Sequence, residues 1–138
     1  MVTLTNIPKD QQVAKIGFRN LVRDLRHREG LAFEYVRFFE VGAKSGMYHY
    51  HLGERGDFVP VRLLSSRASA NGLGRVVDIR RCSGEGPAWY MSKYIAKGLE
   101  TIPLGWRKVS ASRHFWPADQ TAQAHELKWR LIKKTLTC

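Results

Sequence analysis

Two strand-like segments joined by a glycine-rich turn constrain the fold of this chain more than any other feature. Residues 32–41 and 47–52 are rich in aromatic and aliphatic side chains, and the Gly-Ala-Lys-Ser-Gly segment between them has the composition of a turn. This pattern predicts an antiparallel β-hairpin. The chain therefore contains at least one antiparallel sheet, around which the other segments have to be arranged.

A short strand and a long helix are predicted before the hairpin. Residues 2–5, Val-Thr-Leu-Thr, have the alternation of a strand, and Asn6 and Pro8 end it. Apolar side chains at i, i+3, i+4 and i+7 predict a helix over residues 10–29, with Gly30 as its stop. The opposite face of this helix is basic.

The segments after the hairpin continue the alternation of helices and strands. The sequence predicts, in order, a helix over 61–70, a strand over 75–82, a helix over 88–97, a strand over 106–111 and a helix over 118–136. No internal repeat or Pro/Gly/Ser-rich linker divides the chain, so we expect one domain over residues 1–138. Antiparallel strands mixed with covering helices predict an α+β fold, a single central antiparallel sheet with flanking helices.

The charge of the chain indicates a polyanionic partner. It has 23 Lys and Arg against 12 Asp and Glu, a formal net charge of +11, which makes nucleic acid the expected partner. The candidates for nucleic-acid contact lie toward the C-terminus: Arg107, Lys108, Arg113, Lys128, Arg130, Lys133 and Lys134. Aromatic residues are interleaved with them and would suit stacked bases: Trp106, His114, Phe115 and Trp116. The alternative for each basic residue is an ordinary solvated surface.

No segment of the sequence resembles a membrane span or a signal peptide. The apolar runs are far shorter than the about 18 residues needed to cross a bilayer, and the N-terminus lacks a basic region followed by an apolar one. We therefore expect a cytoplasmic protein, in the cytosol of a host cell, with no membrane partner.

A His-Tyr-His segment in the second hairpin strand is a candidate metal site. His49 and His51 are two residues apart, so both imidazoles face one side of the strand and Tyr50 faces the other. Glu40 in the first hairpin strand is a third candidate ligand, because an unpaired carboxylate in an apolar stretch would be costly. A position opposite His49 or His51 would close the hairpin with an even-numbered loop. The alternative is a pair of surface or satisfied core histidines.

A helical stripe of tyrosines and lysines is the candidate catalytic element. Tyr90, Lys93, Tyr94 and Lys97 recur at i, i+3, i+4 and i+7. A phenol with a pKa of about 10 is a poor nucleophile at neutral pH. Nearby cations favour its phenolate and stabilise negative charge on a phosphoryl group. The alternative is a solvated amphipathic helix with tyrosines packed at its margin.

Taken in order, these segments resemble the HUH endonuclease superfamily, and within it the rolling-circle replication initiators (Rep) of small phages, prophages and plasmids. Residues 2–6 are similar to the first family motif, a strand with a Thr-Leu-Thr core. Residues 49–51 match the histidine-hydrophobic-histidine motif, and residues 90–97 match the doubled tyrosine-x-x-lysine motif of the phage type. The three motifs also follow one another in the family's order.

Two further segments extend the resemblance. Residues 78–81 and 110–113 are similar to segments of initiators related to the replication proteins of filamentous phages. The resemblance covers roughly residues 2–116 and does not place the helix expected over 118–136. It implies an antiparallel sheet with flanking helices, in agreement with the expectation from the strand and helix pattern.

The resemblance also implies an activity and a cofactor. The activity is sequence-directed nicking and joining of single-stranded DNA at a replication origin through a covalent 5′-phosphotyrosine, which starts rolling-circle replication. The cofactor is a divalent metal, Mn²⁺ or Mg²⁺, which His49, His51 and Glu40 would hold against the scissile phosphate. Tyr94 or Tyr90 would attack the phosphorus, and the two lysines of the stripe would neutralise the developing charge. A host helicase or polymerase is a further expected partner.

The two tyrosines are expected to act in different steps, Tyr94 in the first attack and Tyr90 in accepting the strand. In plasmid initiators of a similar type, the position matching Tyr94 is the nucleophile and the position matching Tyr90 is a glutamate that helps to end the cycle. Because residue 90 is a tyrosine here, this chain resembles the phage variety, in which a second phenol accepts the strand. Two other functions stay open: a domain that binds DNA without cutting it, and an HUH transposase or relaxase.

Overall fold

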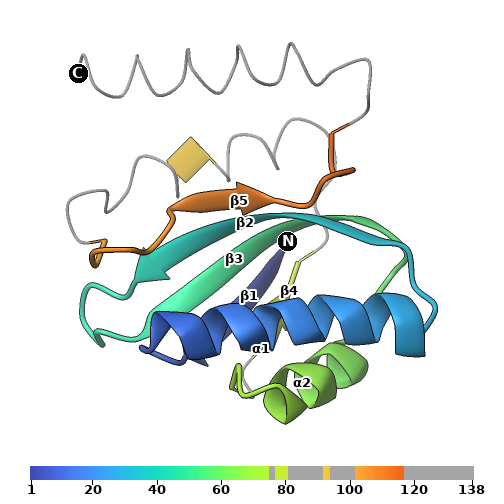
Figure 1. Ribbon diagram of the computed structural model, residues 1–138, viewed down its shortest axis with the longest axis horizontal. Helices are drawn as coiled ribbons and strands as arrows, with labels where there is room; N and C mark the ends of the chain where they lie inside the picture. Colours follow the sequence, from blue (N-terminus) through green and yellow to red (C-terminus); the bar gives the residue numbers. More distant parts are fainter. Residues whose placement is uncertain (75–76, 81–91, 94–101, 117–138) are drawn as a thin grey trace.

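Five antiparallel strands form the framework of the part of the chain that the computed structural model describes, residues 1–74, 77–80, 92–93 and 102–116. Their order across the sheet is β4-β1-β3-β2-β5 (Figure 1). The strands are β1 (Val2–Ile7), β2 (Phe33–Val41), β3 (Tyr48–Gly56), β4 (Val77–Ile79) and β5 (Val109–Ala111). The predicted α+β fold with a single antiparallel sheet is confirmed.

The hairpin that the sequence predicted is formed by β2 and β3, and β3 is the central strand of the sheet. Its turn is closed by the Gly42 amide, which donates to the Met47 carbonyl at 2.8 Å. Strand β3 continues to Gly56, four residues beyond its predicted end, because residues 53–56 pair with the start of β2. The Gly-Glu-Arg-Gly sequence of that segment has little strand preference, so cross-strand pairing decides its conformation.

Two α-helices were predicted in the described part of the chain before β4, and both are present. Helix α1 (Gln11–Arg23) begins after Asp10, whose carboxylate accepts hydrogen bonds from the backbone amides of the first turn. A π-helical turn, η1 (Asp24–Arg28), follows it, and Gly30 at φ +65° ends the helix as expected. Helix α2 (Val61–Ala70) has the bounds that the sequence predicted.

Helices α1 and α2 lie side by side against one face of the sheet, which we call the helix face (Figure 1). Phe18 of α1 packs on Tyr50 of β3, with ring centroids 5.5 Å apart. Gly17 allows the close approach of α1 to the end of α2, because a Cβ atom there would lie 2.5 Å from the Asn71 carbonyl oxygen. The core therefore lies between this face and the two helices, and Leu64 and Ala68 extend it onto α2.

Several boundaries differ from the sequence-based expectation. Strand β1 runs past its predicted end because Asn6 adopts φ +58° and forms a bulge, after which Ile7 pairs with Tyr48. Strand β5 begins only at residue 109, since Trp106 turns into the core and its amide donates to the Pro103 carbonyl. Strand β4 is described over three residues of the predicted 75–82.

The two predicted C-terminal helices cannot be compared over their full length. Of the helix expected over 88–97, the structure describes Ser92 and Lys93, and both are helical. The helix expected over 118–136 lies outside the described residues.

Candidate metal centre

Five polar residues of three adjacent strands share the sheet face opposite to the helices, which we call the histidine face. The register pairs Thr3 with His51, Thr5 with His49, and His49 with Glu40. Because side chains alternate along a strand, all five leave the sheet on the side away from the buried Tyr50. Glu40 therefore lies opposite His49, one of the two positions predicted for it.

Glu40 and His51 are in direct contact across the hairpin. Glu40 Oε2 lies 2.5 Å from His51 Nε2, although the register partner of Glu40 is His49. The side chain thus reaches diagonally, which the spacing between neighbouring strands allows. His51 is only 5% exposed, so the contact lies in a largely desolvated place.

The hydroxyl of Thr3 contacts Nδ1, the other nitrogen of the His51 ring. Thr3 Oγ1 lies 3.2 Å from His51 Nδ1. A hydroxyl can donate to Nδ1 or accept from it, so Thr3 supports either tautomer of His51, including the one that leaves Nε2 free for a metal. Sequence reasoning did not assign this role to Thr3. The pairing of β1 with β3, together with the period of two, is the signal that identifies it.

His51 is held in its neutral form. Burial lowers its pKa below the ordinary value of 6.5, while the hydrogen bond and the charge of Glu40 act in the opposite direction. The nearby charge of Lys108 also lowers the pKa. We therefore treat the contact between His51 and Glu40 as a hydrogen bond rather than as an ion pair. Neutral imidazole is the form that binds metals.

His49 has an unsatisfied ring nitrogen. Its ring centroid lies 6.2 Å from that of His51, with an angle of 33° between the ring planes. His49 Nδ1 is buried and has no hydrogen-bond partner. Gly42 packs at the edge of this ring, since a Cβ atom there would lie 3.1 Å from His49 Nε2. A buried nitrogen without a partner is costly, and a bound proton donor or metal would remove that cost.

The donor set of the histidine face fits a divalent metal, but its three groups are not gathered at one point. Among residues 1–74, 77–80, 92–93 and 102–116, no three His, Cys, Asp or Glu side chains are placed to share a metal ion. Glu40 and His51 are together, and His49 lies alongside them. Two imidazoles and one carboxylate suit Mn²⁺ and other first-row ions, so the chemistry of the residues agrees with the predicted ligands.

The other predicted site residues are only partly described. Lys93, Arg107 and Arg113 are exposed, and Lys108 is partly buried near His51. The remaining ones lie outside the described residues: Tyr90, Tyr94, Lys97, Lys128, Arg130, Lys133 and Lys134.

One residue of the predicted aromatic platform has a different role. Trp106 stacks on Phe39 with a centroid distance of 4.4 Å and packs against the core, so it is not displayed for stacked bases. Trp116 is 42% exposed and packs edge-on against Phe115 at 4.8 Å. Phe115 is partly buried.

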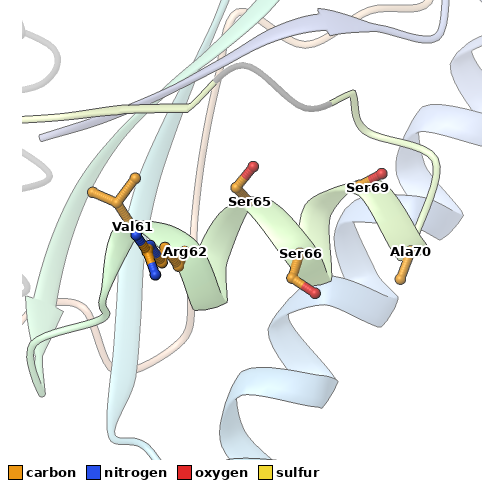
Figure 2. A pocket seen from close by; sticks show the side chains of 6 residues that line it. All are labelled: Val61, Arg62, Ser65, Ser66, Ser69 and Ala70. Carbon is orange, nitrogen blue, oxygen red and sulfur yellow. The ribbon is translucent and has the colours of Figure 1, made fainter.

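A hollow on the molecule lies away from these residues. It has a volume of about 640 Å³ and is open to solvent. Figure 2 shows its lining along α2: Val61, Arg62, Ser65, Ser66, Ser69 and Ala70. It contains no imidazole or carboxylate and therefore does not compete with the histidine face as a candidate metal centre.

Comparisons with protein-family models, curated proteins and solved structures find no match to this chain. Within the part of the chain that the structure describes, no helix has the length and apolar character needed to cross a membrane.

Proposed function

We propose that this protein nicks and rejoins single-stranded DNA at a replication origin through a covalent phosphotyrosine, with a divalent metal at the histidine face. One observation supports the proposal above the others. Glu40 Oε2 meets His51 Nε2 at 2.5 Å, and the neighbouring His49 has a buried ring nitrogen without a partner. Two imidazoles and a carboxylate on one sheet face are expensive to maintain in a fold unless a ligand uses them.

Residues of the histidine face set the protonation and the orientation of the proposed metal ligands. His51 is kept neutral by burial, and Thr3 fixes the orientation of its ring. Glu40 brings a carboxylate to the same face. A bound Mn²⁺ or Mg²⁺ supplies a Lewis acid that polarises the scissile phosphate.

The tyrosine stripe supplies the nucleophile in this proposal. The phenol of Tyr94 loses its proton to solvent and its oxygen attacks the phosphorus. A tyrosine–phosphate ester forms at the 5′ end of the downstream strand, and the bond between phosphorus and the 3′ oxygen is broken. That oxygen leaves and takes up a proton, while Lys93 and Lys97 neutralise charge on the phosphoryl oxygens. Because the ester keeps the energy of the phosphodiester, the strand can be rejoined by the reverse attack. Tyr90 accepts the second strand.

The same proposal assigns the setting of the reaction. Single-stranded origin DNA is the substrate, the cytosol of a host cell is the location, and a host helicase or polymerase acts on the exposed 3′ end. The excess of positive charge over the chain supports a nucleic-acid partner.

The test is adduct formation on a library of single-stranded oligonucleotides with Mn²⁺, followed by a denaturing gel. We expect a protein band shifted by covalently bound DNA. Tyr94→Phe should reduce this band most, and Tyr90→Phe should leave it largely intact while impairing transfer to a second strand. An adduct from the variant that lacks both tyrosines would overturn the tyrosine mechanism.

The same experiment separates the alternatives. DNA binding without any adduct would identify a domain that holds DNA without cutting it. An adduct formed at transposon ends in preference to origin sequences would identify a transposase. Loss of the adduct on removal of Mn²⁺ by a chelator, with recovery on its return, is the expected dependence on the metal.

A further inference from the structure

Arg37 of β2 lies on the helix face in an unusual environment. Its guanidinium carbon is 4.5 Å from the ring centroid of Phe18 and 4.4 Å from that of Tyr50. Within the described part of the chain, its side chain has no ion pair and no hydrogen bond. A guanidinium carries five N–H donors, and placing it among aromatic rings without an acceptor costs free energy. Among the described residues no carboxylate pairs with Arg37, although the register places Glu54 diagonally across β3 on the same face.

The neighbouring strand contributes a second unsatisfied group. The register places Ser110 of β5 directly opposite Arg37, so both side chains leave the same face, with Cβ atoms about 5 Å apart. Ser110 Oγ is buried and has no hydrogen-bond partner. A hydroxyl left in this state is a donor for which the protein provides no acceptor.

A second cation lies close to the same place. Arg107 is exposed and precedes β5 by two residues, next to Lys108, whose carbonyl accepts a hydrogen bond from the Phe39 amide of β2. Burial lowers the pKa of Arg37, and the positive charge of Arg107 acts in the same direction. Two cations that repel each other are stabilised by an anion that both can contact.

We propose that Arg37, Arg107 and Ser110 form a binding site for a phosphate group on the helix face of the sheet. The planar fork of Arg37 matches two phosphate oxygens, and the rings of Phe18 and Tyr50 fix its plane before the ligand arrives. Ser110 donates a further hydrogen bond. The site lies on the opposite face from His49 and His51, so it does not depend on the proposed nicking activity. The phosphate group belongs either to inorganic phosphate or to a nucleic-acid backbone.

The Nε–H signal of Arg37 in a ¹H–¹⁵N spectrum tests this proposal in the whole chain. The signal is assigned by its loss from Arg37→Met. Inorganic phosphate should shift it further than sodium chloride at the same ionic strength. Arg37→Met and Arg107→Gln should each weaken phosphate binding about tenfold, and Ser110→Ala should weaken it by a smaller factor. Arg62→Gln, on the exposed side of α2, is the matched control and should bind phosphate as the wild type does.

A titration with a short oligothymidylate distinguishes the two sources of phosphate. If the oligonucleotide shifts the Arg37 signal and competes with phosphate, the site takes a nucleic-acid backbone. If only inorganic phosphate shifts the signal, the site takes the free anion. An Arg37 signal that moves no more than in sodium chloride would overturn the proposal. If Arg37→Met does not fold, Arg107→Gln tests the proposal instead. Unchanged phosphate affinity in folded Arg107→Gln would also overturn the proposal.

Discussion

The two faces of the sheet are formed by the same strands but differ in the side chains that they carry. On the helix face, Leu4, Tyr50 and Leu52 are almost completely buried under α1 and α2. On the histidine face, the alternate positions of the same strands carry hydroxyl, imidazole and carboxylate groups. His51 is as buried there as many core residues, but both of its ring nitrogens have partners.

This difference separates the residues that stabilise the chain from those available for chemistry. Burial of apolar area explains the part of the helix face that Leu4, Tyr50 and Leu52 form, because these side chains gain free energy from packing. It does not explain the histidine face, where the unpartnered His49 Nδ1 costs free energy instead. Substitutions on the two faces should therefore have separable effects, on stability for one face and on activity for the other.

The largest effect is expected from the histidine face. Replacing His49 and His51 together by Ala should reduce adduct formation by more than about a hundredfold, because metal ligands contribute at least as much as the groups that orient them. DNA affinity should stay close to that of the wild type, since phosphate contacts supply most of it. His27→Ala, at an exposed position of η1, is the control and should keep full activity. Wild-type adduct levels in the double variant would remove the histidines from the mechanism.

The helix face should respond in stability instead. Leu21→Ala, in the buried side of α1, should lower the free energy of unfolding by about 2–5 kcal/mol in urea denaturation. Val13→Ala on the exposed side of the same helix should change it by no more than about 0.5 kcal/mol. The Mn²⁺ affinity of folded Leu21→Ala should equal that of the wild type. A large change in that affinity would show that the two faces are not separable.

A smaller effect, on Mn²⁺ affinity, is expected from Thr3, which orients the ring of His51. Thr3→Val keeps the β-branched shape that suits β1 but removes the hydroxyl that contacts His51 Nδ1. We expect a loss of about tenfold in Mn²⁺ affinity, with little change in thermal stability. Thr3→Ser retains the hydroxyl and should restore the affinity. Equal affinities for Val and Ser variants would mean that the hydroxyl does not act on His51.

The smallest effect concerns a charge buried on the helix side of the molecule. Asp24 is 6% exposed, and its pKa lies below the ordinary 3.8, chiefly because Asn71 donates a hydrogen bond and also because Arg28 and Arg23 are near. The carboxylate therefore adds stability above pH 3.8, which is lost as the pH falls through the lowered pKa of the folded state. Asp24→Asn should be less stable than the wild type at neutral pH. Thermal melts should converge for the two proteins in acid, and a constant gap would contradict this role.

Much of this fold could be predicted because the signals are local. The hairpin, Asp10 as N-cap, Gly30 as helix stop and the bounds of α2 all follow from spacing and capping within a few residues. The sequence left two positions open for Glu40, opposite His49 or opposite His51, and the strand register places it opposite His49.

The remaining features depend on contacts between distant segments. The bulge at Asn6 and the extension of β3 to Gly56 are set by pairing with neighbouring strands, which overrides local preference. The contact between Thr3 and His51 joins residues 48 positions apart and requires β1 to lie beside β3. The environment of Arg37 likewise exists only once α1 covers the sheet.

The most direct measurement of the central claim is the paramagnetic broadening of backbone amide signals by Mn²⁺ in the folded chain. Binding at the histidine face should broaden the amides of Thr3, Glu40, His49 and His51 at the lowest Mn²⁺ concentrations. Those of Leu64 and Ala68 on α2 should stay sharp, and the double histidine variant should lose the effect. Uniform broadening, or broadening that persists in that variant, would contradict a metal centre at Glu40, His49 and His51.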